Sequence, residues 1–99
     1  LEVEYRKRLA KIQRSDPFHA FVQAGNAENA GDLSRAIREY RRAVALQPQE
    51  HRFHSALANA YLKAGKTALA IRSLARAQAL TDGDTRAAYS QRLDALRAR

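Results

Sequence analysis

The 99-residue sequence contains no cysteine. This absence excludes structural disulfides, cysteine-type zinc sites and thiolate nucleophiles. Its apolar stretches are all far shorter than the roughly 18 residues that a transmembrane helix requires, so the sequence predicts no membrane-spanning segment. It also shows no signal-peptide pattern.

Helix-breaking residues are scarce, with 4 glycines and 2 prolines, while alanine and arginine are abundant. This composition favours helix over nearly the whole chain. The formal net charge of +8 favours an acidic partner. Charge alone leaves open whether that partner is an acidic protein, a nucleic acid or an anionic lipid surface.

The sequence repeats with an offset of 34 residues, which pairs residues 17–50 with residues 51–84. Internal repeats of this length are typical of helical arrays, in which each unit packs on its neighbours. The offset gives ten identities: Ala24 with Ala58, Ala30 with Ala64, Gly31 with Gly65, Ala36 with Ala70, Ile37 with Ile71, Arg38 with Arg72, Arg42 with Arg76, Ala43 with Ala77, Ala45 with Ala79 and Leu46 with Leu80.

This pattern resembles the tetratricopeptide repeat family, whose units consist of a helix, a tight turn at glycine and a second helix. Gly31 and Gly65 occupy the turn positions, and Ala36 and Ala70 are the small residues where two helices cross closely. The rest of the signature is Tyr40, Leu74, Ala43, Ala77, Leu46, Leu80, Pro48, Leu57, Ala58 and Tyr61. The sequence departs from the pattern at Gln23 and Ala27, which replace large core residues of the first helix, and at Asp82, which replaces a proline.

The resemblance implies an all-α fold, a right-handed superhelix of antiparallel helix pairs with about six helices. We expect a single domain over residues 1–99, with a remnant or flanking helix in 1–16, repeats in 17–50 and 51–84, and a capping helix in 85–99. The expected helices are 2–14, 17–30, 33–46, 51–64, 67–80 and 85–98.

The two flanking helices have particular expected roles. In the repeat register, residues 1–14 are the second helix of an incomplete unit, which we expect to dock on helix 17–30 through Leu9 and Ile12. Helix 85–98 has the polar residues Gln91 and Arg92 at its inner positions, as suits a cap. Helix N-caps are expected at Asp16, Asp32 and Asp84.

No catalytic constellation is present in the sequence. His51 and His54 lie one helical turn apart, but they lack the third ligand and the base of a catalytic zinc site, so we expect them to pack or face solvent. The serines have no histidine–carboxylate partners, and Asp82 and Asp84 fit turn and cap roles. The sequence therefore predicts no enzyme activity, no cofactor and no metal.

The resemblance also implies a concave groove, lined by the first helix of each unit, that binds a peptide or protein segment. Asn59 occupies a position where family members hydrogen-bond the ligand backbone. Ser55, Ala56 and Ser90 stand where members that bind chaperone C-termini carry charged or amide side chains, so that carboxylate clamp is incomplete. The predicted groove residues are Phe18, Phe21, Arg52, Ser55, Asn59, Leu62, Lys63, Arg86 and Tyr89. For Phe18 and Phe21 the alternative is burial beneath helix 2–14.

We therefore expect a non-enzymatic protein-interaction module, part of a larger bacterial protein of this family. Arg52, Lys63 and Arg86 have no acidic residue assigned beside them, which favours an acidic partner in the groove. The alternative is a basic surface on the outer, second helices that binds nucleic acid or anionic lipid. Its residues are Arg38, Arg42, Arg72 and Arg76.

Overall fold

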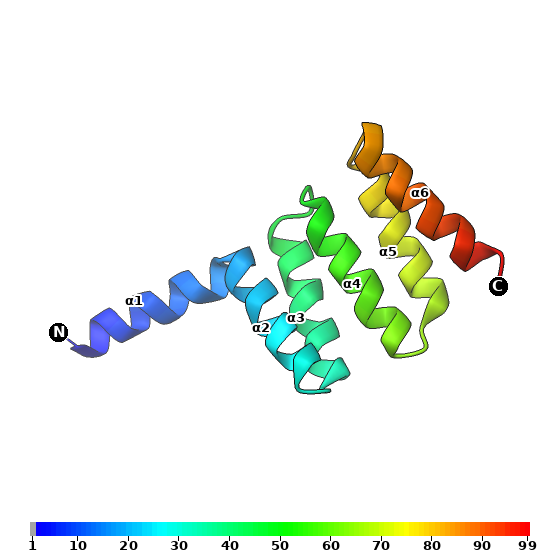
Figure 1. Cartoon of the computed structure of the whole chain (residues 1–99). Coiled ribbons are helices and arrows are strands. Elements are labelled where there is room, and N and C mark those ends of the chain that lie inside the picture. The colour runs from blue at the N-terminus through cyan, green and yellow to red at the C-terminus, as the bar shows by residue number, and fades with distance from the viewer. Residues whose placement is uncertain (1) are drawn as a thin grey trace.

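A computed structural model describes residues 2–99, which form six α-helices and no strand. The helices lie side by side in sequence order, with α1 extending from one end of the array (Figure 1). The predicted all-α helical repeat is confirmed. Their bounds are α1 Glu2–Ser15, α2 Pro17–Asn29, α3 Leu33–Leu46, α4 His51–Lys63, α5 Thr67–Ala79 and α6 Gly83–Arg97.

Acidic residues are the N-caps of three helices, where their side chains accept hydrogen bonds from free backbone N–H groups. Asp16 accepts from the N–H of Phe18 at 2.9 Å, and Asp32 accepts from the N–H of Arg35 at 3.1 Å. The cap of α4 is Glu50, which the sequence analysis did not identify. The prediction for Asp84 is wrong, because α6 begins at Gly83 and places Asp84 in its first turn.

The two repeat glycines end α2 and α4 in the left-handed conformation. Gly31 has φ +81° and Gly65 has φ +77°, which glycine adopts without the steric cost of a Cβ. The next residue in each turn donates its N–H to the carbonyl five residues earlier, Asp32 to Ala27 at 2.9 Å and Lys66 to Tyr61 at 2.8 Å. This is the Schellman arrangement, and it satisfies backbone carbonyls at the helix ends.

Each helix from α2 to α5 packs on the next one in the chain. Ala36 and Ala70 are fully buried, and so are the repeat-related Ala43 and Ala77. Their small side chains allow the helices to approach closely, as the repeat pattern predicts. The main core consists of Ala24, Ala27, Ala36, Tyr40, Leu57, Ala58, Ala60, Tyr61, Ala70, Leu74, Ala77, Tyr89, Leu93 and Leu96.

The first helices of successive units also contact one another. Phe53 of α4 is buried, and its ring lies 5.3 Å from that of Phe18 and 5.1 Å from that of Phe21 on α2. Tyr89 of α6 contacts the next first helix, α4, through a hydrogen bond between its hydroxyl and Nδ1 of His51. We call the accessible sides of α2, α4 and α6 the first-helix face, and those of α3 and α5 the outer face.

Helix α1 projects away from the array (Figure 1). Val3 and Tyr5 are 66% and 67% exposed. The predicted docking through Leu9 and Ile12 lies outside the side chains that the structure describes. The aromatic side chains that pack against Phe18 and Phe21 come from α3 and α4.

The register of α6 differs from the prediction. Its buried residues are Tyr89, Leu93 and Leu96, rather than the positions around Gln91 and Arg92. Tyr89, Leu93 and Leu96 follow the buried Phe53, Leu57 and Ala60 of α4 at an offset of 36 residues rather than 34. The helix thereby turns its largest apolar side chains toward α4 and α5.

Candidate functional site

All nine predicted groove residues come from α2, α4 and α6, but their exposure differs widely. Five are exposed, namely Phe18, Arg52, Asn59, Lys63 and Arg86. Three are half-buried, namely Phe21, Ser55 and Leu62, and Tyr89 is buried. The polar contacts of these residues decide which of them are available to a partner.

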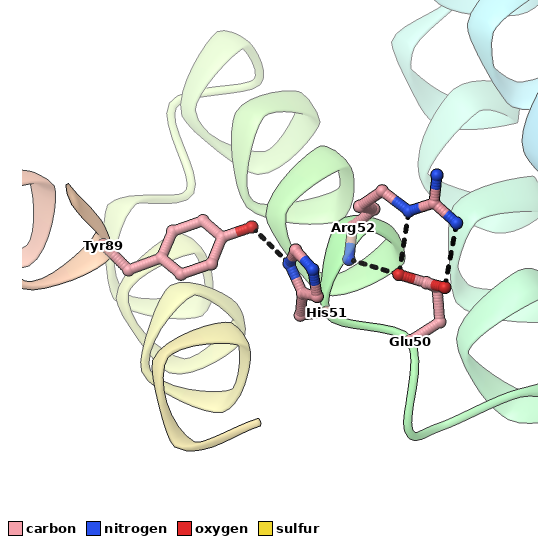
Figure 2. Close-up of polar contacts among 4 residues, drawn as sticks. All are labelled: Glu50, His51, Arg52 and Tyr89. Atoms are coloured by element: carbon pink, nitrogen blue, oxygen red, sulfur yellow. Dashed lines mark hydrogen bonds and ion pairs between the residues drawn. The ribbon is translucent and has the colours of Figure 1, made fainter. Parts of the chain in front are cut away.

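Arg52 is paired with Glu50 (Figure 2). Its Nε and Nη2 donate to the two carboxylate oxygens at 2.9 and 3.0 Å, and its backbone N–H donates to the same carboxylate at 3.2 Å. The side-chain hydrogen bond from Arg52 is the main reason why the pKa of Glu50 falls to about 2. The expectation that Arg52 has no acidic residue beside it is therefore wrong.

Lys63 is also paired, with Glu28 of α2. Glu28 accepts a second hydrogen bond from the hydroxyl of Tyr40 at 2.7 Å. Burial by itself raises the pKa of Glu28, but the hydrogen bonds from Lys63 and Tyr40 outweigh burial, so the net pKa is lowered. The expectation of an unpaired Lys63 is wrong as well, and the ion pair instead ties α2 to α4.

Phe18 offers the main apolar contact surface among the predicted residues. Its ring packs edge-on against Phe53, and the Arg52 guanidinium carbon lies 5.9 Å from its centroid. At this distance the cation and the ring attract one another weakly. The ring is nevertheless 45% exposed, so a partner could cover it.

Tyr89 belongs to the core rather than to the accessible face. Only 8% of it is exposed, and its hydroxyl hydrogen-bonds Nδ1 of His51 at 2.7 Å (Figure 2). The two rings meet edge-on at 5.7 Å. The prediction that Tyr89 supplies exposed contact area is corrected, and the residue instead joins α6 to α4.

Arg92 is a residue of this face that the sequence analysis did not select. It is half-buried on α6, and its Nη1 donates to the hydroxyl of Ser55 at 3.3 Å. Its Nη2 donates to the side-chain oxygen of Asn59. The apolar spacing of Tyr89, Leu93 and Leu96 is the sequence signal that would have placed Arg92 beside α4.

Two other predicted polar positions have structural roles. Ser90 accepts a hydrogen bond from Gln78 of α5 at 2.7 Å, so it lies between α5 and α6. His54 is buried, and its Nε2 contacts the carbonyl oxygen of Pro48 at 2.8 Å. Across the described residues, no three side chains of metal-binding type gather into a group.

The outer face carries the alternative basic site. Arg38, Arg72 and Arg76 are exposed, while Arg42 is half-buried and lies 4.0 Å from Glu39. A depression with a volume of about 430 Å³ opens on α3. It is lined by Ser34, Ile37, Arg38, Arg41 and Arg42.

No helix within residues 2–99 is both long enough and apolar enough to cross a membrane. The family model described as TPR repeat matches residues 19–65 of the chain. The search of curated proteins found no match to this chain.

Solved structures share the fold. The type III secretion translocator chaperone SycD of Yersinia enterocolitica has a TM-score of 0.80 at 22% identity, over 93% of this chain and 67% of SycD. PcrH, solved in complex with the chaperone binding region of PopD, has a TM-score of 0.81 at 20% identity, over 94% of this chain and 74% of PcrH.

Proposed function

Because residues 19–65 match the family model described as TPR repeat, we propose that the chain is a non-enzymatic module that binds a segment of another protein. The binding surface that we propose is the first-helix face, where the family resemblance implies a concave groove. The bound segment is extended or helical, and the net charge of +8 favours one that carries acidic residues.

The observation that carries this proposal is the partial exposure of Phe18 above Phe53. A large aromatic ring held in place by a buried neighbour provides contact area at little entropic cost. A few such anchors supply most of the affinity in protein interfaces. Half-buried Leu62 and exposed Asn59 and Arg86 lie on the neighbouring helices of the same face and can add apolar and polar contacts.

PcrH supports the class of partner that we propose. It has the same fold and was solved with a segment of the protein PopD bound. A fold that presents an array of short helices suits such recognition, because successive units extend one binding surface.

Selection from a displayed peptide library, followed by affinity measurements on the selected peptides, tests the proposal. Phe18→Ala should weaken binding about tenfold or more, because it removes the exposed anchor. Leu69→Ala is the matched control, since Leu69 is 37% exposed but lies on α5. Equal losses in both variants, or a loss with Leu69→Ala alone, would contradict the first-helix face.

An uncharged test residue is needed because charge reversal on this face changes more than the binding surface. Replacing Arg52 or Lys63 by glutamate would also break the ion pairs with Glu50 and Glu28. Phe18→Ala removes the ring beside the Arg52 guanidinium, but it keeps both members of each ion pair. Its effect on binding can therefore be read without reversing a charge.

The depression on α3 favours a second candidate function, in which the basic outer face binds nucleic acid or anionic lipid. Binding of a labelled 20-nucleotide RNA and of vesicles containing anionic lipid would measure it. The double variant Arg38→Gln with Arg72→Gln should then weaken binding and reduce its salt dependence. Phe18→Ala should leave it unchanged, and the opposite pattern would contradict this candidate.

A further inference from the structure

The depression on α3 combines three arginines with a hydroxyl group and an apolar side chain. It is lined by Ser34, Ile37, Arg38, Arg41 and Arg42. Helical residues that are three, four or seven positions apart lie on one face, so this spacing gathers the three guanidinium groups around a single depression. Two of these arginines are exposed and the third is half-buried.

Little negative charge within the chain compensates these cations. Glu39 lies 4.0 Å from Arg42, and an ion pair at that distance between partly exposed groups contributes little. Among residues 3–8 and 15–99, whose side chains the structure describes, no carboxylate forms an ion pair with Arg38 or Arg41. Like charges held close together repel one another, so a bound anion would be stabilised by several cations at once.

The second repeat lacks two members of this set. At the offset of 34 residues, Ser34 corresponds to Ala68 and Arg41 corresponds to Ala75, whereas the other two arginines recur on α5. The hydroxyl and the third cation are therefore not required by the repeat. Both of these additional groups line the same depression.

We propose that the depression on α3 binds a phosphomonoester group. The guanidinium groups of Arg38, Arg41 and Arg42 surround the phosphate, and the hydroxyl of Ser34 donates a further hydrogen bond. This inference rests on the second candidate function, which it narrows from a basic surface to one site with a defined ligand. It does not depend on binding at the first-helix face.

A phosphomonoester suits the depression better than other anions. The planar guanidinium group donates two parallel hydrogen bonds to phosphate oxygens. A phosphomonoester carries a charge of about −1.5 to −2 at pH 7, so it gains more from three cations than a singly charged diester does. The volume of about 430 Å³ lies in the range of small-molecule sites and leaves space for an organic group beside Ile37.

The phosphomonoester can belong to a soluble phosphorylated molecule or to the headgroup of a lipid such as phosphatidic acid. Both sources present the same group to the arginines. A nucleic acid chain differs, because its internal phosphates are diesters.

The test is a nuclear magnetic resonance titration of the ¹⁵N-labelled chain with phenyl phosphate, a monoester, and with methyl phenyl phosphate, the matching diester. The ionic strength is held constant, and the shifted amide signals locate the site. The titrations are repeated with Arg41→Gln and with the control Arg35→Gln. Arg35 is an exposed arginine of the same helix, but it does not line the depression.

We expect phenyl phosphate to shift amide signals of α3 and to bind about tenfold more tightly than the diester, because its second charge is available to the arginines. Arg41→Gln should weaken the monoester about tenfold, as expected for a lost hydrogen bond to a charged group, and Arg35→Gln should weaken it much less. Affinity for the monoester should also fall as the pH is lowered through the second phosphate pKa of about 6.

Sedimentation with vesicles separates the two sources. Vesicles that contain phosphatidic acid present a monoester, and vesicles that contain phosphatidylglycerol present a diester. Retention of the chain by phosphatidic acid alone, lost in Arg41→Gln, would assign the site to a lipid headgroup. Binding of phenyl phosphate without retention by either vesicle would assign it to a soluble ligand, and both results support the proposal.

Other outcomes overturn the inference. They are no binding of phenyl phosphate, equal affinities for the monoester and the diester, and equal effects of Arg41→Gln and Arg35→Gln. A melting curve checks the folding of each variant, and Ser34→Ala supplies a second variant, because the second repeat already carries alanine at this position. Ser34→Ala should weaken the monoester about 2- to 10-fold, and unchanged affinity would remove the hydroxyl from the site.

The failure of this inference differs from the failure of the function on which it rests. If labelled RNA binds and responds to Arg38→Gln with Arg72→Gln, while phenyl phosphate does not bind, the basic outer face stands and the phosphomonoester site falls. If neither RNA, vesicles nor phenyl phosphate binds, both fail.

Discussion

The hydrogen bond from Tyr40 to Glu28 is the polar contact whose contribution to stability can be worked out most directly. Tyr40 is 4% exposed, and its hydroxyl lies 2.7 Å from a carboxylate oxygen of Glu28. Burial, together with the neighbouring carboxylate, raises the pKa of Tyr40, so it remains a proton donor under ordinary conditions. Tyr40→Phe removes the hydroxyl and keeps the ring that packs against Phe21.

A hydrogen bond to a charged group contributes about 1.5–3 kcal/mol to the free energy of unfolding. The loss in Tyr40→Phe should be somewhat smaller, about 1–2 kcal/mol, because Glu28 keeps Lys63 as a partner and reaches solvent. For a domain of this size each kcal/mol lowers Tm by about 4–8 °C. Urea unfolding of the parent and the variant at pH 7 measures the difference.

The effect of Tyr40→Phe should also depend on pH. The folded-state pKa of Glu28 is below its ordinary value. Its contribution to stability is therefore complete above the unfolded-state pKa and is lost as the pH falls through the folded-state pKa. The difference between parent and variant should be largest at pH 7 and should shrink as the pH falls through the folded-state pKa of Glu28, where the carboxylate becomes neutral.

The control is Tyr61→Phe, which removes a hydroxyl from another buried tyrosine. Tyr61 is 8% exposed, and its hydroxyl has no hydrogen-bond partner among the side chains and backbone that the structure describes. This change should cost less than about 0.5 kcal/mol. Equal costs for the two tyrosines, or a cost of Tyr40→Phe that stays the same as the pH is lowered until Glu28 is protonated, would refute the reasoning.

Three further changes follow from the packing and the turns. Ala36→Leu or Ala70→Leu overpacks a fully buried crossing and should cost about 1–3 kcal/mol, measured as a shift in Tm; no shift in either would contradict the close contact. Gly65→Ala should cost about 1–2 kcal/mol in urea unfolding because of its positive φ, whereas helical Gly25→Ala should be neutral or stabilising, so a reversed order would refute the turn assignment. Asp32→Ala removes an N-cap and should cost about 0.5–2 kcal/mol by the same measurement, and Asp32→Asn should restore most of it.

The fold followed from local features of the sequence. Gly31 and Gly65 mark backbone positions that need a positive φ, and Ala36 and Ala70 mark contacts where a larger side chain does not fit. These requirements act on single residues at fixed spacing, so a repeat offset is enough to reveal them. The helix bounds therefore agree with the prediction within two residues.

The site was predicted less completely, because its chemistry depends on which side chains meet. The 34-residue offset placed Tyr89 in the groove, whereas the shifted register of α6 buries it. Arg52 and Lys63 were assigned to the correct helix, but their pairing with Glu50 and Glu28 depends on side-chain geometry. The repeat register predicts the helix face on which a residue lies. It does not predict which side chain that residue contacts.

The order in which the helices touch has a consequence for folding kinetics. Each helix from α2 to α5 packs on its immediate successor, so most contacts form between segments close in the chain. Closing short loops costs little entropy, and chains with such local contacts fold rapidly. Folding can begin at α2 with α3 or at α4 with α5 and then propagate in either direction. The terminal helix α6, which packs at the end of the row, should be among the first elements to exchange its amide hydrogens with solvent.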